Sequence, residues 1–124
     1  MTFGKERLRK LYVDMVRVRK LDEQLVRDAT QGTELPFYHS QHGQEAVGVG
    51  AVSFLNQDDY VLYGHRGHGI SKLLPKGLSA RDILAEHYGK TSGSCNGLSR
   101  FHVADMEYGL PGISGTLGGD FVIA

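Results

Sequence analysis

Hydrophobic residues recur at steps of three and four over residues 5–30, which predicts one long amphipathic helix. The apolar positions of this segment are Leu8, Leu11, Tyr12, Met15, Val18, Leu21 and Leu25. Lysine and arginine fill much of the remaining surface, and Gly32 supplies a stop. Such a helix is long for a globular protein, so we expect it to lie across a surface or a partner.

The pattern after this helix predicts shorter elements. We expect a second helix from about residue 43, GQEAVGVGAVSFL, and a buried strand over residues 60–63, YVLY. Ser79 opens another helix, with Asp82 as a weak capping box, and Gly89 ends it. Residues 90–120 show no sustained hydrophobic period. Loops of this length are usually functional or disordered. The order indicates part of an α/β domain, incomplete because one strand cannot make a sheet.

The composition narrows the class of protein. In 124 residues, 14 Lys and Arg balance 14 Asp and Glu, so we expect neither nucleic acid nor an anionic membrane surface as a partner. No apolar run approaches the ~20 residues of a membrane span. The single cysteine, Cys95, cannot form an internal disulfide, which favours a reducing compartment, and we expect the cytoplasm.

Glycine is the unusual component. The chain holds 17 glycines, about twice the ~7% average, and most lie between Gly64 and Gly119 without a fixed period. Glycine at such density in a chain of ordinary apolar content indicates tight turns, or backbone that lies close to a ligand. The segment between Gly109 and Gly119 matches no phosphate-loop pattern, so a flexible connection remains the alternative there.

The turn His65-Arg66-Gly67-His68 follows the predicted strand directly. Ligands of open α/β sheets bind at the carboxyl ends of strands, and Arg offers a planar fork to oxyanions. The turn is therefore a candidate site for a phosphate or carboxylate. The alternative is a surface turn whose His and Arg side chains contact solvent or a neighbouring carboxylate.

Two further hypotheses, a zinc site and a nucleophilic cysteine, stay open. His39 and His42 repeat the H-x-x-H spacing of His65 and His68, a spacing that can bind zinc, although zinc sites usually add cysteines or a longer pattern. Cys95 has no base near it in the sequence, which makes a nucleophilic role less favoured than a bystander one.

Taken together, these segments resemble a known family. The order FYHSQHGQEAVGVG, DDYVLYGHRGHG, LSARDILAEHYGKTSGSCNG, FHVAD and GLPGISG is similar to the amino-terminal part of the alpha subunit of thiamine-diphosphate-dependent 2-oxo acid dehydrogenases, the E1 components. The HRGHG form with YGK-x-x-G-x-C most resembles the acetoin dehydrogenase branch, and the pyruvate dehydrogenase branch comes next.

The resemblance implies a role for each matching residue. Phe37 and His39 match the channel to the cofactor, and His39 would act there in substrate or acyl-group handling. Other matching positions would bind thiamine diphosphate: His65 and Arg66 its diphosphate, and the backbone of Gly112 and Ser114 its aminopyrimidine ring. The family's Mg²⁺-binding G-D-G…N segment has no match, so no metal ligand is expected within this chain.

The resemblance also implies a fold and partners. Residues 1–124 would form the amino-terminal portion of the diphosphate-binding domain, a partial thiamine-diphosphate fold with a parallel sheet flanked by helices. The enzyme would cleave acetoin or a 2-oxo acid such as pyruvate and transfer the acyl unit to a lipoyl carrier on the E2 acyltransferase. It would assemble with an E1 beta subunit and a second alpha subunit. The chain alone is expected to be inactive, and the alternative is a non-catalytic binding or assembly module.

Overall fold

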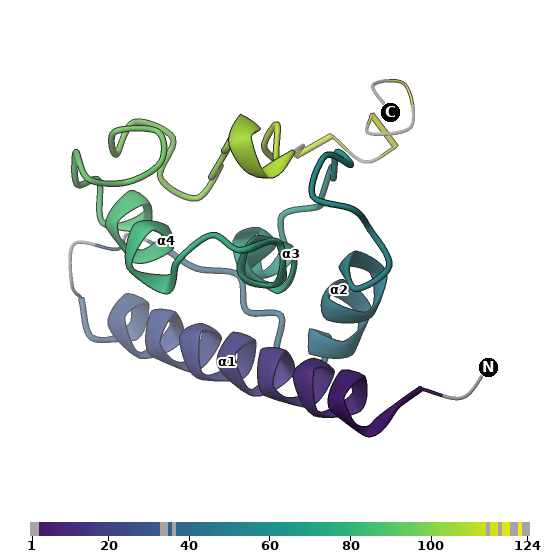
Figure 1. Cartoon of the computed structure of the whole chain (residues 1–124). Helices are drawn as coiled ribbons and strands as arrows, with labels where there is room; N and C mark the ends of the chain where they lie inside the picture. The colour runs from purple at the N-terminus through teal and green to yellow at the C-terminus, as the bar shows by residue number, and fades with distance from the viewer. Residues whose placement is uncertain are drawn as a thin grey trace.

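The computed structural model describes residues 3–32, 35, 37–113, 115, 116, 118, 119 and 122. One long helix, α1 (Lys5–Thr30), runs beneath three shorter helices (Figure 1). These are α2 (Glu45–Val52), α3 (Ile70–Lys76) and α4 (Ala80–His87). The 3-10 turns η1 (Arg66–Gly69) and η2 (Met106–Tyr108) complete the element order. The chain after α4 crosses the side of α3 and α4 that is remote from α1 (Figure 1).

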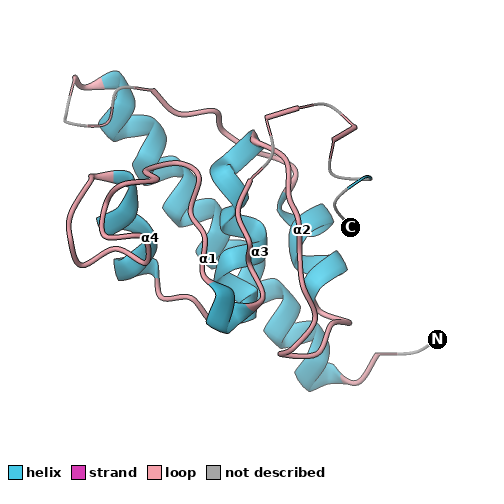
Figure 2. Cartoon of the chain, turned by 90° about the horizontal axis from the view of Figure 1, so that it is seen from above, coloured by secondary structure: helices cyan, strands magenta, loops and turns pink. Residues whose placement is uncertain are grey.

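The expectation of a parallel sheet is wrong. Within the residues that the structure describes there is no strand, and Figure 2 shows helices joined by loops. Tyr63 pairs with Ile113 in a parallel bridge, and Asp105 pairs with Leu110 in an antiparallel one, but both bridges are isolated. Among the described residues, the YVLY segment has no backbone pairing beyond this bridge and one bond from the Val61 amide to the Gly109 carbonyl. An extended segment without a paired strand forms no sheet.

Helix α1 has the predicted bounds, but the apolar stripe is fully buried only in its second half, while Leu11 and Met15 of the first half are half-buried against the core. Val18, Leu21 and Leu25 are buried, and they pack with residues of α2, α3 and α4. Leu8 and Tyr12 are exposed, Tyr12 by 65%. The helix therefore extends beyond the core of this chain, and its first half leaves apolar side chains in contact with solvent.

Helices α2 and α3 approach each other closely. A Cβ atom added at Gly48 in α2 would lie 1.9 Å from the Oγ of Ser71 in α3, so only glycine fits this contact. The sequence pattern does not predict α3, because its seven residues are too few to show a period and include Pro75. Pro75 lies in the last turn, and Gly77 follows the helix in a left-handed conformation.

The buried ammonium group of Lys76 organises the turn before the predicted strand. Its Nζ donates hydrogen bonds to the backbone carbonyls of Asn56, Gln57 and Asp59, at 2.9, 2.8 and 2.9 Å. The partners of this charge are thus backbone dipoles, which satisfy the donors of a buried ammonium group. The contact ties the end of α3 to residues 56–59.

The buried carboxylate of Glu86 organises the loop after α4. The helix begins as predicted, with Ser79 accepting a hydrogen bond from the Asp82 amide. One oxygen of Glu86 accepts from the amides of Cys95 and Gly97 at 2.8 and 3.0 Å. The other accepts from the amides of Ser99 and Arg100 and the Ser99 hydroxyl, at 2.9, 3.0 and 2.9 Å. Residues 95–100, which we call the Glu86 loop, are thus wrapped around one side chain.

An ion pair joins α1 to the start of α2. Arg19 Nε lies 2.6 Å from Glu45 Oε1, which also accepts from the Gly43 amide at 3.1 Å. The hydrogen bond from Arg19 lowers the pKa of Glu45 to about 2, although burial acts in the opposite direction. Because Glu45 is buried, water and salt screen this ion pair less than they screen a pair on the surface.

We expect Arg19→Met to lower the free energy of unfolding by about 1 kcal/mol near neutral pH. The pKa of Glu45 is lowered in the folded state, so its contribution is complete above the ordinary carboxyl value of 4.5 and is lost as pH falls toward about 2. Urea unfolding at pH 7 and pH 3 measures both effects. The control is Lys20→Met, which removes an exposed pair with Glu23. Equal losses in the two variants at pH 7 would contradict the assignment.

Candidate active site

The segment that carries Phe37 and His39 is fixed to α1 through a buried carboxylate. Asp22 accepts hydrogen bonds from the Tyr38 hydroxyl and the Ser40 hydroxyl, both at 2.6 Å, and from the Gln41 amide at 3.0 Å. Burial, followed by the bond to Asp22, raises the pKa of Tyr38 well above its ordinary value. Tyr38 therefore stays an uncharged donor, and the residues on either side of it have a defined position.

The predicted anion-binding turn lies against this segment. The Gly67 amide donates to the His39 carbonyl at 2.6 Å, and the imidazole centroids of His39 and His65 are 5.4 Å apart. Gly67 has φ +62°, and a Cβ at this position would lie 2.3 Å from the Gln41 side chain. The glycine is thus required both by the left-handed backbone and by the close approach of Gln41. Two motifs separated in sequence meet at this point.

The exposed side of this contact carries the groups expected to meet a ligand. His39, His65 and Arg66 are exposed, and Arg66 Nη1 lies 3.5 Å from the Ser40 carbonyl. Phe37 is 48% exposed, and its ring centroid lies 5.3 Å from that of His39. The arrangement presents a guanidinium group, two imidazoles and an aromatic face to solvent.

Sequence reasoning missed Phe101 as a member of this surface. Its ring centroid lies 4.4 Å from that of Phe37 and 5.2 Å from that of His68. The only signal was its place in the FHVAD motif, directly before His102. Phe101, from the loop that follows α4, adds a second ring to the aromatic face of Phe37.

The structure brings one of the two predicted backbone positions toward the turn. Gly112 is buried with φ +123°, and the next residue, Ile113, pairs with Tyr63. Because Tyr63 directly precedes Gly64 and His65, the Gly112 segment runs beside the entry to the turn. Ser114 lies outside the described residues, so its predicted contact stays a prediction.

The zinc hypothesis finds no geometric support in the part of the chain that the structure describes. No group of three or more His, Cys, Asp and Glu side chains there could hold a metal ion. Cys95 is held by its neighbours: its amide donates to Glu86 and its Sγ lies 3.2 Å from the Ala104 carbonyl. These contacts favour a structural role for the thiol.

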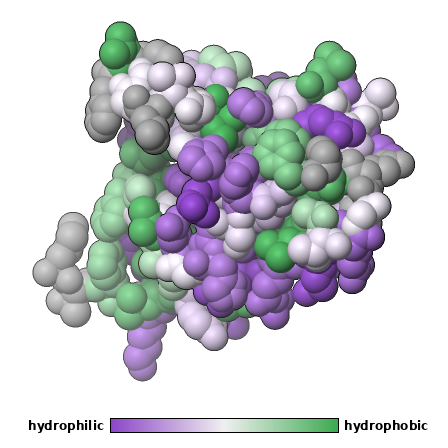
Figure 3. All heavy atoms as spheres, turned by 180° about the vertical axis from the view of Figure 1, so that it is seen from behind, coloured by the Kyte–Doolittle hydropathy of each residue, from purple (hydrophilic) through white to green (hydrophobic). Residues whose placement is uncertain are grey.

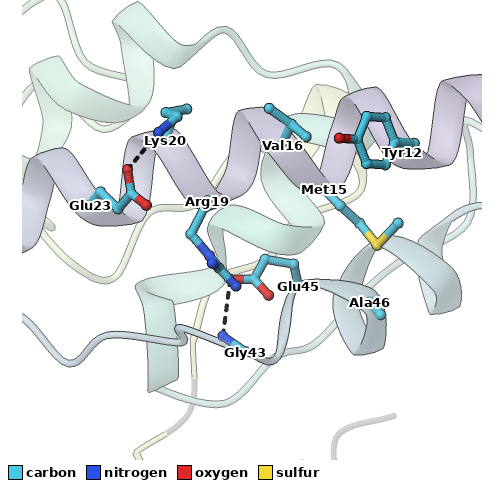
Figure 4. A pocket seen from close by; sticks show the side chains of 9 residues that line it. All are labelled: Tyr12, Met15, Val16, Arg19, Lys20, Glu23, Gly43, Glu45 and Ala46. Atoms are coloured by element: carbon cyan, nitrogen blue, oxygen red, sulfur yellow. Dashed lines mark hydrogen bonds and ion pairs between the residues drawn. The ribbon is translucent and has the colours of Figure 1, made fainter.

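A separate pocket of about 450 Å³ lies between α1 and the start of α2. Figure 4 shows Arg19 reaching from α1 to Glu45 at its floor, with Tyr12 and Val16 above. Its lining residues are Tyr12, Met15, Val16, Arg19, Lys20, Glu23, Gly43, Glu45 and Ala46. None of the predicted site residues is among them, so this hollow is distinct from the candidate site.

Comparison with known proteins identifies the family. Residues 13–124 match the family model of the dehydrogenase E1 component, and the chain belongs to this family. It is 39% identical over 119 residues to the alpha subunit of acetoin:2,6-dichlorophenolindophenol oxidoreductase of Cupriavidus necator, covering 95% of this chain and 35% of that protein. The same subunit of Bacillus subtilis is 34% identical, with coverages of 92% and 34%.

Pyruvate dehydrogenase subunits follow in similarity. The E1 component subunit alpha-3 of Oryza sativa, a chloroplastic protein, is 38% identical over 93 residues, which cover 75% of this chain and 21% of that protein. The predicted resemblance, with the acetoin branch before the pyruvate branch, is confirmed. The chain spans about a third of the length of the first relatives. No solved structure matches. Among the described residues, no helix is long and apolar enough to cross a membrane.

Proposed function

We propose that the chain forms the diphosphate-facing part of an E1 alpha subunit in a thiamine-diphosphate-dependent dehydrogenase. The enzyme would act on acetoin or on a 2-oxo acid such as pyruvate and transfer an acyl unit to a lipoyl carrier. The observation that carries the proposal is the contact between the His39 segment and the His65–Arg66 turn, through the bond from the Gly67 amide to the His39 carbonyl. Two family motifs thereby share one surface.

The residues present fit such a cofactor. Arg66 is exposed and can form a planar, two-pronged contact with diphosphate oxygens, while a Cβ at Gly64 would meet nothing within 4 Å, so the backbone beside it is open to approach. The rings of Phe37 and Phe101, tilted by 44° to each other, offer aromatic surface to an organic ring. Gly112 and Ser114 remain proposed backbone contacts of the aminopyrimidine. We assign no residue of the chain to Mg²⁺.

When bound, thiamine diphosphate supplies carbanion stabilisation, and the protein supplies orientation and electrostatics. In this proposal Arg66 and His65 hold the diphosphate. His39 lies beside His65 and faces solvent, where an imidazole can transfer a proton to a substrate or acyl group or steady a developing charge. Phe37, whose ring lies next to that of His39, would line the channel to the cofactor.

We expect Arg66→Gln to weaken the binding of thiamine diphosphate by about tenfold, because one charge-assisted contact with the diphosphate is lost. Calorimetry on the complete subunit, assembled with its partner chain and supplied with Mg²⁺, measures this. Inorganic pyrophosphate has only the diphosphate group in common with the cofactor. Its affinity should therefore fall by the same factor in Arg66→Gln. Arg81→Gln, which removes an exposed guanidinium on α4, is the matched control. Equal affinities for the two variants would contradict the assignment.

The surface supports assembly with other chains. Exposed large hydrophobic side chains on and near α1 and α2 include Leu8, Tyr12, Val13, Val16, Val47, Phe54 and Leu55. Seen from behind, hydrophobic side chains interrupt the hydrophilic surface (Figure 3). Such groups are typical of protein interfaces. An E1 beta subunit, a second alpha subunit and a lipoyl-bearing E2 acyltransferase are the proposed partners, and the cytoplasm is the proposed compartment. Sedimentation of this chain as a compact, stable monomer would count against assembly.

A further inference from the structure

Two buried histidines lie behind the candidate site and have no part in the proposed function. His68 in η1 is 3% exposed, and His87 at the end of α4 is 0% exposed. Their ring centroids are 5.8 Å apart, with an interplanar angle of 81°. His68 also lies next to the site, with its centroid 5.8 Å from that of His39. The pair therefore connects α4 to the segment that carries His39.

Hydrogen bonds at one nitrogen of each ring determine where the protons lie. Nδ1 of His87 lies 2.8 Å from the Ile83 carbonyl oxygen, which can only accept, so Nδ1 carries the proton. In a neutral ring, Nε2 is then an acceptor. Nε2 of His68 lies 3.2 Å from the His39 amide nitrogen, which can only donate, so Nε2 is unprotonated. A neutral His68 must therefore carry its proton on Nδ1.

The two remaining nitrogens are complementary. Nδ1 of His68 is a donor and Nε2 of His87 is an acceptor, and neither has another hydrogen-bond partner among the described residues. Buried polar atoms are normally paired. Because these two are of opposite kind, they can satisfy each other, after a small ring rotation or through one internal water molecule.

Burial favours the uncharged form of both rings. The titratable groups that face His68 are the imidazoles of His39, His65, His87 and His102, with the ring of Tyr38 against it. His87 adjoins Glu86, whose carboxylate is committed to the Glu86 loop, and packs against Tyr38. Burial, followed by the neighbouring imidazoles, lowers the pKa of His68 to about 3, and burial also lowers that of His87.

We propose that His68 and His87 form a neutral donor–acceptor pair, each with its proton on Nδ1, and that His87 is a positioning residue which acts through His68 on His39. Protonation of His68 would turn Nε2 into a second donor facing the His39 amide, and that hydrogen bond would be lost. His68 also has φ +44°, a conformation that a non-glycine residue keeps only when its surroundings fix it. The pair supplies that fixation. Only its effect on catalysis rests on the proposed function.

The first test uses the wild-type chain, so it does not depend on the folding of a variant. Long-range proton–nitrogen correlation spectra of histidine-labelled protein report which imidazole nitrogen carries the proton. We expect both His68 and His87 to show the Nδ1–H form, and His68 to remain uncharged at pH 5.5. A proton on Nε2 of His68, or a charged His68 at this pH, would overturn the proposal.

The second test separates positioning from packing. His87→Gln keeps an oxygen acceptor near the place of Nε2, whereas His87→Phe keeps a ring without one. We expect the Nδ1–H group of His68 to keep an acceptor in His87→Gln and to lose it in His87→Phe, which shifts the Nδ1 signal of His68 and the amide signal of His39. His42→Phe, which replaces an exposed imidazole, is the control. Identical His68 spectra in the two His87 variants would refute the role of His87.

A kinetic readout then tests the effect on the enzyme. In the complete, cofactor-loaded enzyme we expect His87→Phe to lower kcat by about tenfold or more with unchanged cofactor affinity, and His87→Gln to recover most of it. If the enzyme uses no thiamine diphosphate, the proposed function fails while the spectra still decide the state of the pair. If the spectra show the expected pair but kcat is equal in the wild type, His87→Gln and His87→Phe, the positioning role is wrong.

Discussion

Replacing Glu86 by leucine is expected to lower the free energy of unfolding by about 3 kcal/mol or more, the largest effect of any single change proposed for this chain. Leucine fills much of the volume but accepts no hydrogen bond. The amides of Cys95, Gly97, Ser99 and Arg100 would lose their common acceptor at once. We therefore expect the Glu86 loop to exchange its amide protons rapidly in the variant, as measured by hydrogen exchange alongside urea unfolding.

Acid should reproduce part of this loss in the wild type. Burial by itself would raise the pKa of Glu86, but the amides of Gly97 and Cys95 and the Ser99 hydroxyl outweigh it, and the pKa lies below its ordinary value. The contribution is therefore complete above the ordinary carboxyl pKa and is lost as pH falls through the lowered one. The control for Glu86→Leu is Glu107→Gln, which changes an exposed carboxylate. Unchanged protection of the Glu86 loop in Glu86→Leu would contradict the role of Glu86.

Replacing Gly48 by alanine is expected to destabilise the protein by about 1 to 3 kcal/mol, although alanine favours helix. The new methyl group would lie 1.9 Å from Ser71 Oγ and 2.4 Å from Ser71 Cβ, so α2 and α3 would have to separate. Separation would disturb the helix that follows the His65–Arg66 turn. Thermal or urea unfolding measures the change.

The same helix contains the matched control. A Cβ at Gly50 would meet nothing within 4 Å, so Gly50→Ala should stabilise the protein by about 0.5 to 1 kcal/mol through helix propensity alone. Opposite signs for the two substitutions are the expected result. Adding Ser71→Gly to Gly48→Ala should recover part of the loss, because it removes the nearest clashing atoms. Equal effects at Gly48 and Gly50 would show that the helices do not approach as described.

Local patterns predicted the helices where the pattern is long or capped. The periodicity of α1 and the cap at Ser79 gave the observed helix starts, because both signals arise within a few residues. The pattern could not tell that Tyr12 stays exposed while Leu25 is buried, since that depends on what packs against each half of α1. It also misassigned YVLY, because a strand exists only with a partner.

The site was predictable to the level of motifs. HRGHG and FYHSQ directed attention to His39, His65 and Arg66, and the structure brings His39 and His65 together. The supporting residues were not predictable, because their role depends on contacts between distant segments. The irregular composition of the Glu86 loop hides the fact that Glu86, on the preceding helix, holds four of its amides.

The ammonium group of Lys76 has a consequence for how freely the protein can vary. It recognises residues 56–59 through main-chain carbonyls, which every amino acid possesses. The shape of this turn is therefore encoded partly at a distant position. The Gln57 side chain donates in return to the Lys76 carbonyl at 3.4 Å, whereas the exposed side chain of Asn56 is left available for other uses. An inherited change at 56 would be tolerated, whereas one at 76 would alter a turn that it does not belong to.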